Sequence, residues 1–371
     1  MSASCGMIAE AIEKLAPREW AEPWDNVGLL VGMPEQRIEN VLLTLDVTQA
    51  VIDEAVELNA GLIISHHPFP LRAVKRFRTD SLDGSMLAKL LRGNISLYAA
   101  HTNLDIALGG VNDVLADRLS LRDVKILRQR SDALVKIVTF VPRDYEETVW
   151  RAMSGAGAGC IGGYSECGFR VTGIGTFLPG TNTQPFIGEP NRLSRVEETR
   201  IETVAPAVLA NTIVEALIEA HPYEEVAYDI FPLNNERFIS GLGRIGALTN
   251  PMTLSDFAKQ VREVLRAGGV RMVGDPGALV QKVAVCGGAG MEVSQDAVRC
   301  GAQVLVTGDI RYHDAQEAMA MGLCLIDAGH FATEFPVLNS LQGLLRKCSE
   351  TNDWHCRFEV SDRQADIWRW F

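Results

Sequence analysis

The sequence predicts an α/β protein in which two similar α/β halves form one core, with a ferredoxin-like α+β domain inserted between them. Strand-like and helix-like runs alternate over residues 41–105 and again over 282–334. This rhythm is typical of largely parallel sheets with covering helices. Residues 134–233 follow a different order of runs. We therefore divide the chain into residues 1–126, 127–235 and 236–371.

The first half alternates predicted strands with predicted helices. Its strands are VLLTLDV (41–47), GLIISHHP (61–68) and ISLYAAHTNLD (95–105), and its helices are AVIDEAVELNA (50–60) and SMLAKLLRG (85–93). The strand segments are rich in Val, Ile and Leu, which favours strands that are buried.

The same rhythm returns in the second half. Its predicted strands are KVAVCGGAG (282–290), QVLVTGDIRYHDA (303–315) and LCLIDAGHFATE (323–334), and SQDAVRCGA (294–302) is a predicted helix. Without gaps, residues 55–65 align in pattern with residues 297–307, which places His67 opposite Asp309. Each half then ends its next strand with a histidine followed four residues later by a carboxylate. These two coincidences indicate an internal duplication.

The segment between the halves is predicted to be a domain of its own. Its elements are a strand (134–142), a helix (146–157), two strands (169–179 and 195–206), a helix (208–222) and a strand (224–233). The order βαββαβ is that of a ferredoxin-like unit. A compact unit with neighbouring ends can be inserted into a host domain without disturbing it.

The composition of the chain limits the partners that it can bind and indicates its cellular compartment. With 47% hydrophobic and 22% charged residues, the 371-residue chain has enough apolar surface for a sizeable core. The net charge of −12 argues against binding nucleic acid or an anionic membrane, and a ring that threads nucleic acid would need a positive cavity. The N-terminus lacks the pattern of a secretory signal, and no apolar run is long enough to span a membrane. Eight cysteines without a CxxC pair indicate reduced, buried thiols and a cytoplasmic protein.

The strongest local signal for chemistry is the pair His66-His67, which ends a predicted strand just before Pro68. Neighbouring residues of a strand point in opposite directions, but a strand that breaks at proline can turn both rings into one crevice. The carboxyl end of a strand in an α/β sheet is also where ligands bind. For an isolated pair, one packed histidine and one surface histidine would be the more frequent arrangement.

The pair is not isolated, because His101 and Asp105 lie four residues apart, as do His330 and Glu334. If a helical turn starts after each strand, this spacing puts imidazole and carboxylate on one face. Either motif alone would more often be a helix cap. At equivalent positions of two repeats they indicate a metal site, and a His and carboxylate set without cysteine suits Zn²⁺, Fe²⁺ or Mn²⁺.

Other polar groups are candidates for supporting roles. Asp309 and His313 follow the strand that matches the His66-His67 strand, and either could orient a ligand imidazole or move protons. His101 is a further candidate for proton transfer. The segment WDNVG (24–28) fits a supporting element of the site and an ordinary turn equally well.

Three further motifs are assigned structural roles in preference to ligand binding. GLGRIG (241–246) fits a dinucleotide pattern but lacks the strand before it and the helix after it. GGAG (287–290) follows a strand but lacks the lysine of a phosphate loop, so a tight turn is favoured. HPYEE (221–225) is assigned to a helix end and turn, with ligand binding as the lesser alternative.

Six segments resemble the Nif-three-like dinuclear-metal-centre family, also named GTP cyclohydrolase 1 type 2 homologues. They are WDNVGLLVG (24–32), SHHPFP (65–70), AAHTNLD (99–105), VAVCGGAG (283–290), GDIRYHDAQ (308–316) and DAGHFATE (327–334). The resemblance covers residues 1–125 and 236–371. The insertion, with HPYEE, is similar to the trimeric CutA-like fold of longer bacterial members.

The resemblance implies two divalent ions per chain, with Glu334 as the bridge between them. The implied ligands are His66, His67, Asp105, His330 and Glu334. It also implies a homohexameric toroid with the metal sites facing an interior cavity. The family name implies hydrolytic opening of the guanine ring of GTP, although a shared fold does not fix a reaction.

Two functions of different class follow. The first is a metal-dependent hydrolase acting on GTP or a phosphoester, in which basic groups bind the phosphates of a nucleotide. The candidate basic groups are Arg72, Lys75, Arg76 and Arg311, and Arg78 belongs to the same basic run. The second is a non-catalytic metal-handling protein or regulatory scaffold whose inserted domain senses a partner.

Overall fold

The computed structural model describes residues 2–70, 78–161 and 164–370. It divides into two compact units. Unit 1 comprises Met1–Arg130 and Ile239–Phe371, and unit 2 comprises Ser131–Phe238. Unit 1 therefore contains both halves of the sequence in one body. The predicted class is confirmed at the level of a mixed α/β protein with several sheets.

The first sheet of unit 1 has five strands in the order β15-β4-β5-β6-β2. The strands are β2 (Gly28–Val31), β4 (Asn40–Thr44), β5 (Leu62–Ser65), β6 (Ser96–Ala99) and β15 (Arg357–Val360). All are parallel except β2, which is antiparallel to β6. Because β15 comes from the C-terminal end of the chain, the first sheet is not made by the N-terminal half alone.

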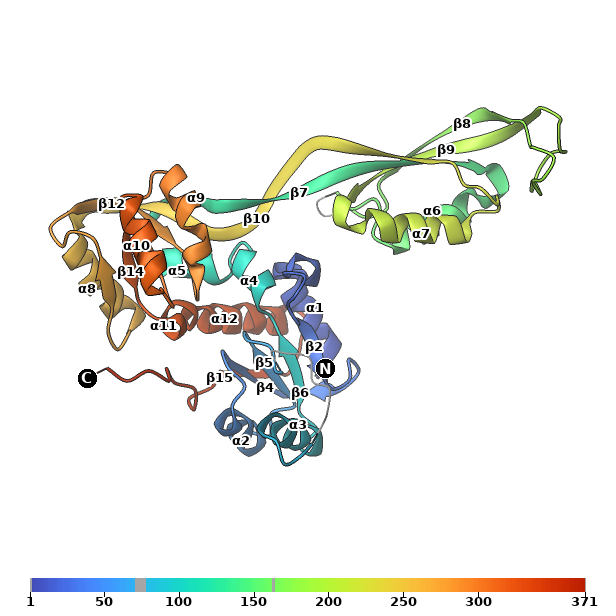
Figure 1. Cartoon of the computed structure of the whole chain (residues 1–371). Helices are drawn as coiled ribbons and strands as arrows, with labels where there is room; N and C mark the ends of the chain where they lie inside the picture. The colour runs from blue at the N-terminus through green and yellow to red at the C-terminus, as the bar shows by residue number, and fades with distance from the viewer. Residues whose placement is uncertain (1, 71–77, 162–163, 371) are drawn as a thin grey trace. The chain divides into compact units, whose positions relative to one another are not determined.

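Helices cover both faces of this sheet, so its strands are buried on both sides. One face packs on α1 (Cys5–Leu15) and α12 (Pro336–Thr351), and the other packs on α2 (Gln49–Glu57) and α3 (Leu82–Arg92). Figure 1 shows α12 running along the sheet, which joins the C-terminal part of the chain to the N-terminal part.

The second sheet of unit 1 repeats this plan. Its parallel strands are β12 (Leu279–Val285), β13 (Val304–Thr307) and β14 (Cys324–Asp327), flanked by antiparallel β11 (Arg271–Val273) and β10 (Tyr228–Thr253). The helices that cover it are α5 (Val111–Arg118) and α8 (Leu254–Leu265) on one face, and α9 (Ser294–Arg299) and α10 (Tyr312–Ala320) on the other.

Equivalent helix ends support the predicted alignment of the halves. Helix α2 is followed by Asn59 with φ 49°, and α9 is followed by Gly301 with φ 75°. Helices commonly stop at such a left-handed residue, which Asn and Gly tolerate best. The alignment of residues 55–65 with 297–307 places these two residues opposite each other.

Several strands are shorter than predicted. The strand predicted for 95–105 stops at Ala99 and gives way to α4 (Thr102–Ile106), and the strand predicted for 323–334 stops at Asp327 and gives way to α11 (His330–Glu334). The polar residues at these ends belong to turns and short helices, because the apolar stretch that a buried strand needs has ended.

Unit 2 contains the elements β7, α6, β8, β9, α7 and β10 in chain order. Their bounds are β7 (Arg122–Pro142), α6 (Glu146–Gly155), β8 (Gly168–Phe177), β9 (Ser194–Pro206) and α7 (Ala210–Ala220), with β10 as above. The strand order is β10-β7-β9-β8, and both helices pack on one face. Strands β7 and β10 are longer than the predicted strands 134–142 and 224–233, because each includes residues that belong to unit 1.

The cysteines differ from the prediction in their burial. All eight are unpaired, but only Cys5 and Cys286 are buried, and Cys160 is exposed. Among the described residues, no helix is both long and apolar enough to cross a bilayer.

A buried ion pair joins the two halves of unit 1. Arg244 of β10 is 1% exposed and makes two hydrogen bonds to Asp113 of α5, at 2.6 and 2.8 Å. It also donates to the carbonyl oxygens of Gly241, Gly243 and Ala107. The GLGRIG motif therefore lies within a strand, where its arginine serves packing between the halves.

We expect Arg244→Met to lower the free energy of unfolding by about 3 kcal/mol, because it removes the cationic partner of Asp113 and leaves the carbonyl oxygens of Gly241, Gly243 and Ala107 without a donor. Chemical denaturation monitored by circular dichroism measures this loss. Arg118→Met, which removes an exposed arginine from the same α5 helix, is the control and should change stability by less than about 0.5 kcal/mol. Equal effects of the two substitutions would show that the buried pair does not hold the halves together.

Candidate metal centre

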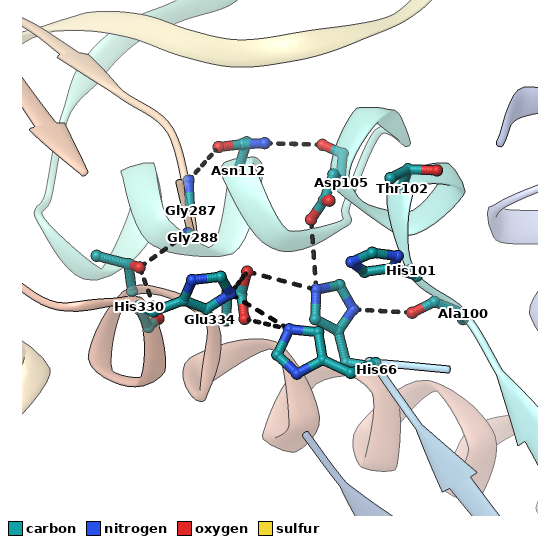
Figure 2. A network of polar contacts seen from close by, with 12 residues as sticks. His66, Ala100, His101, Thr102, Asp105, Asn112, Gly287, Gly288, His330 and Glu334 are labelled. Carbon is teal, nitrogen blue, oxygen red and sulfur yellow. Dashed lines mark hydrogen bonds and ion pairs between the residues drawn. The ribbon is translucent and has the colours of Figure 1, made fainter. Parts of the chain in front are cut away.

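The candidate centre lies in unit 1 at the carboxyl ends of parallel strands. His66 and His67 follow β5, His101 follows β6, and His330 follows β14. Figure 2 shows His66, His101 and His330 gathered around Asp105 and Glu334. Segments more than two hundred residues apart in sequence thus meet at one point, as the repeated motifs predict.

The two adjacent histidines converge because the chain leaves β5 at this point. The backbone N–H groups of His66 and His67 donate to the carbonyl oxygens of Thr44, the last residue of β4, and Leu45, the residue that follows it. Successive residues of a regular parallel strand would not both bond the same neighbour. The two ring centroids consequently lie 5.0 Å apart with an interplanar angle of 44°.

Glu334 occupies the middle of the cluster. Its Oε2 lies 3.1 Å from Nε2 of His67, and its Oε1 lies 3.1 Å from Nε2 of His330 and 3.7 Å from Nε2 of His66. Asp105 Oδ1 lies 3.5 Å from Nε2 of His66. These residues form two sets of three that share the Glu334 carboxylate: His66 with Asp105, and His67 with His330.

Each imidazole is held through its other nitrogen. The Nδ1–H groups of His67, His101 and His330 donate to carboxylates at 2.8–2.9 Å, and Nδ1–H of His66 donates to a carbonyl at 2.8 Å. The acceptors are Asp46 for His67, Asp25 for His101, Asp309 for His330 and the carbonyl of Ala100 for His66. Acceptors of this kind fix the tautomer and leave every Nε2 facing the cluster, which is how histidines that bind metals are usually oriented.

The charges of the cluster perturb its acid–base equilibria. Burial lowers the pKa of His67, but hydrogen bonds and charges from Asp46 and Glu334 outweigh burial and raise it to about 10. The same balance, with Glu334 and Asp309, raises the pKa of His330 to about 9. Burial raises the pKa of Glu334, but its imidazole neighbours hold it well below the usual range. Such concentrated perturbation is typical of functional sites.

Three polar atoms of the cluster are buried and make no hydrogen bond of good geometry among the described residues: Nε2 of His66, Oδ1 of Asp105 and Oε2 of Glu334, although Oε2 lies 3.1 Å from Nε2 of His67. Buried polar atoms are nearly always satisfied, because an unsatisfied one costs about 1–3 kcal/mol. All three point into the same cluster, so a group that binds there would satisfy them together. Their donor types, imidazole nitrogen and carboxylate oxygen, fit divalent Zn, Fe or Mn.

A glycine turn leaves room for the central carboxylate. Gly288 has φ 61°, and a Cβ at this position would lie 2.3 Å from Oε1 of Glu334 and 3.3 Å from Nε2 of His330. Its backbone N–H donates to Thr333 Oγ1 at 3.0 Å, which ties the turn to α11. The GGAG motif is therefore a tight turn, as predicted, and it also forms one wall of the cluster.

The same turn is linked to the first half. Asn112 is fully buried, donates to the carbonyl of Asp105 at 2.8 Å and accepts from N–H of Gly287 at 2.9 Å (Figure 2). One side chain thus holds a loop from each half, so that Asp105 and Glu334 keep their relative position.

A cavity of about 770 Å³ opens beside His67 and His330. Its opposite wall is the C-terminal segment 363–369, which contains Arg363, Trp368 and Arg369. This segment is anchored by Gln364, whose Oε1 accepts from N–H of Leu45 at 2.8 Å. The cluster is therefore reachable from a space large enough for a small molecule.

The structure brings together most, but not all, of the predicted site residues. Asp309 contacts the cluster by holding His330, which is the orienting role considered for it. His313 is exposed on α10, contacts Gln316 at 3.1 Å and belongs to none of the His and carboxylate groups, so its position gives no support to proton transfer at this site. Arg311 pairs with Asp314 and does not line the cavity, whereas residues 72, 75 and 76 lie outside the described residues.

Sequence reasoning missed the carboxylate of Asp46 and left that of Asp25 undecided. Asp46 follows β4, the strand beside β5, and the carboxyl ends of parallel neighbours share one edge of the sheet. This position could have marked it as a partner of His67. Asp25 accepts from Nδ1–H of His101 at 2.9 Å, which makes WDNVG part of the cluster; burial raises the pKa of Asp25, but His101 and Thr102 outweigh it and lower the value to about 2.

Comparison with known proteins agrees with the six motifs. A family model described as Duf34/NIF3 (NGG1p interacting factor 3) matches residues 3–367. The chain belongs to this family. A Bacillus subtilis relative named GTP cyclohydrolase 1 type 2 homolog is 45% identical over 344 residues, covering 92% of each chain. A Mycobacterium tuberculosis relative of the same name is 40% identical over 381 residues, covering 98% of this chain and all of its own.

Two solved structures share the fold over the whole chain. A Bacillus cereus protein related to NIF3 superposes with a TM-score of 0.74 at 40% identity, with all of both chains covered. A Staphylococcus aureus protein superposes with a TM-score of 0.76 at 30% identity over 100% of this chain and 99% of its own. The similarity spans the halves and the insertion of this Duf34/NIF3 protein alike.

We expect Gly288→Ala to displace Glu334 and to destabilise the protein by about 1–3 kcal/mol, because it adds a clash and a strained backbone conformation. A crystal structure of the variant and its thermal unfolding check both effects. Gly343→Ala is the matched control: Gly343 lies in α12 with open space around its Cβ position, so alanine should stabilise that helix slightly. An unmoved Glu334 would show that the turn does not shape the cluster.

Proposed function

We propose that this Duf34/NIF3 protein holds two divalent metal ions, with Glu334 bridging them. His66 and Asp105 would complete one site, and His67 and His330 the other. The support is the shared carboxylate between two sets of three ligand atoms, together with the three buried, unsatisfied polar atoms. Zn²⁺, Fe²⁺ and Mn²⁺ all suit this donor set.

We further propose that the centre is that of a metal-dependent hydrolase. Two such ions supply Lewis-acid polarisation of the bond to be cleaved and acidify water at neutral pH. The chain itself contributes the orientation of the ligands through Asp46 and Asp309. His101 would transfer protons: its ring lies 5.2 Å from that of His66 and 5.4 Å from that of His67, and Asp25 holds its Nδ1.

The substrate class that we propose is a nucleotide, with opening of the guanine ring of GTP as the first reaction to test. The names of the relatives support GTP as the first candidate. The cavity beside the cluster is lined by Arg363 and Arg369 as well as by the carboxylates of Asp46, Asp309 and Asp366. Arg363 is paired with Glu57, so Arg369 is the residue that we propose to contact the phosphate groups of an anionic substrate.

The alternative is a non-catalytic metal-handling protein or regulatory scaffold. The observation that favours it is unit 2, residues 131–238, whose described residues contain none of the His and carboxylate groups able to hold a metal. So large an insertion is more readily explained by assembly or sensing than by catalysis at a site in unit 1.

The organisation that we propose is a duplicated core, residues 1–126 and 236–371, with a ferredoxin-like, CutA-like domain inserted at 127–235. The element order βαββαβ and the strand order β10-β7-β9-β8 support the ferredoxin-like assignment. A cytoplasmic homohexameric toroid is the assembly implied by the family resemblance, and sedimentation analysis of the purified protein tests it.

The metal proposal predicts how the number of bound ions changes with each ligand. Glu334→Gln should abolish binding of both ions, whereas Asp105→Asn and His330→Gln should each reduce the number of ions from two per chain to one. Elemental analysis after dialysis against Zn²⁺, with thermal melts to confirm folding, measures this pattern. Glu350→Gln, an exposed position on α12, is the control and should keep both ions. Two ions retained by Glu334→Gln would contradict a bridging role.

The hydrolase proposal predicts turnover that depends on the ions. Metal-loaded protein should convert GTP to a ring-opened product that chromatography and mass spectrometry can identify. Glu334→Gln should reduce turnover to background while Glu350→Gln leaves it unchanged. Full metal occupancy without turnover of GTP, other nucleotides or model phosphoesters would favour the metal-handling alternative.

A further inference from the structure

Unit 2 contains a cavity of about 410 Å³ that the metal chemistry does not involve. It lies beside the end of β8, the loop that follows β8 and the HPYEE turn. Aromatic rings and carboxylates line it: Phe140, Phe177, Phe186, Tyr223, Glu198, Glu224 and Glu225. No lysine or arginine is among the described residues of its lining.

The aromatic rings of this cavity support one another. Tyr223 lies 6.1 Å from Phe177 and 6.3 Å from Phe186, measured between ring centroids. Tyr145 meets Phe186 edge-on at 5.6 Å and 89°, from outside the cavity. Three rings from two loops and a strand end thus form one connected wall, and the faces of such rings attract cations.

Glu198 is a buried carboxylate without a cation. It is 8% exposed, and its one hydrogen-bond partner within the described part of the chain is the hydroxyl of Tyr223, which donates to Oε1 at 2.8 Å. Gly175 makes its position possible, because a Cβ there would lie 1.9 Å from Oε2. Burying an ionised carboxylate is costly unless a positive charge compensates it.

Several cationic side chains on or next to this sheet contact other carboxylates, and Arg200 also lies over the ring of Phe140, at 5.9 Å from its centroid. Lys136 and Arg200 contact Glu202 at 2.9 Å each, and Arg143 contacts Glu197 at 3.4 Å. None of the ion pairs between described residues involves Glu198.

The HPYEE motif orients this cavity. His221 is 7% exposed; its Nε2–H donates to the carbonyl of Phe140 at 3.0 Å, and its Nδ1 accepts from N–H of Tyr223 at 3.1 Å. Both ring nitrogens make hydrogen bonds, and Nδ1 accepts one, so the imidazole is neutral. It holds Tyr223 in the position from which its hydroxyl reaches Glu198. Glu224 accepts from N–H of Gln184, which holds the loop after β8 over the cavity.

We propose that this cavity binds a small organic cation, an alkylated ammonium group, with its charge against Glu198 and its apolar substituents against the rings of Phe177, Phe186 and Tyr223. A bare metal ion fits less well. The carboxylates of Glu198, Glu224 and Glu225 do not converge on a point as metal ligands do, and the described groups with that spacing all lie at the centre in unit 1. Aromatic walls around a carboxylate are the arrangement that recognises alkylammonium ligands.

Calorimetric titration of the full-length protein with choline tests this inference, and 3,3-dimethyl-1-butanol is its uncharged analogue of the same shape. We expect choline to bind one site per chain and the neutral analogue to bind at least tenfold more weakly. Equal binding of the two, or no binding of choline, would overturn the proposal, because the charge of Glu198 would then have no role.

Two substitutions locate the binding. Glu198→Gln keeps the shape of the side chain and its contact with Tyr223, and Phe186→Ala removes one ring; each should weaken choline binding at least tenfold. Glu197→Gln, on the neighbouring exposed position, is the control and should bind choline as the wild type does. Thermal melts confirm that each variant is folded. Unchanged affinity in folded Glu198→Gln would place the binding elsewhere and reject the site.

Discussion

The structure of unit 1 depends on placing one buried carboxylate, Glu334, among three imidazoles. A charge in that position is costly unless several partners compensate it, and here the partners come from both halves of the chain. The surrounding features serve this placement: a glycine turn that makes room for the carboxylate, a buried asparagine that ties the two halves together, and carboxylates that fix each imidazole from behind. The packing of the core and the geometry of the site therefore depend on each other, and a substitution in either half changes the cluster.

The similar plan of the two sheets explains how a single site draws on both of them. Both halves end a strand with a histidine and a carboxylate four residues apart, but only the first half carries adjacent histidines; the aligned position in the second half holds Asp309. His67 and Asp309 thus stand at equivalent positions, one facing the cluster and the other orienting the histidine that faces it. The two loops are complementary, since one supplies an extra imidazole and the other supplies its support.

The site could be predicted from sequence better than the elements around it. His66, His67 and the two repeated motifs were informative because strand ends in parallel sheets converge, so that spacing along the chain translates into position in space. The carboxylates that orient the histidines were harder to predict from sequence. Asp46 follows an apolar strand without any local signal, and only the pairing of β4 with β5 brings it to His67. β15 joins the first sheet from the far end of the chain, and no local pattern encodes such a pairing. The residues lining the cavity in unit 2 meet through loops, and sequence showed only the HPYEE turn.

The electrostatics of the cluster also determine how cations would enter it. The pKa values of His67 and His330 are raised to about 10 and 9, because Glu334 and the carboxylates behind each ring favour the protonated imidazole. A metal ion that takes these nitrogens must displace their protons, so binding weakens as pH falls and more protons compete. Protons and metal ions are thus alternative partners for one buried carboxylate. The same physical requirement operates in unit 2, where Glu198 lies buried with a tyrosine hydroxyl and aromatic faces but without a cation, so that its charge is best compensated by a bound ligand.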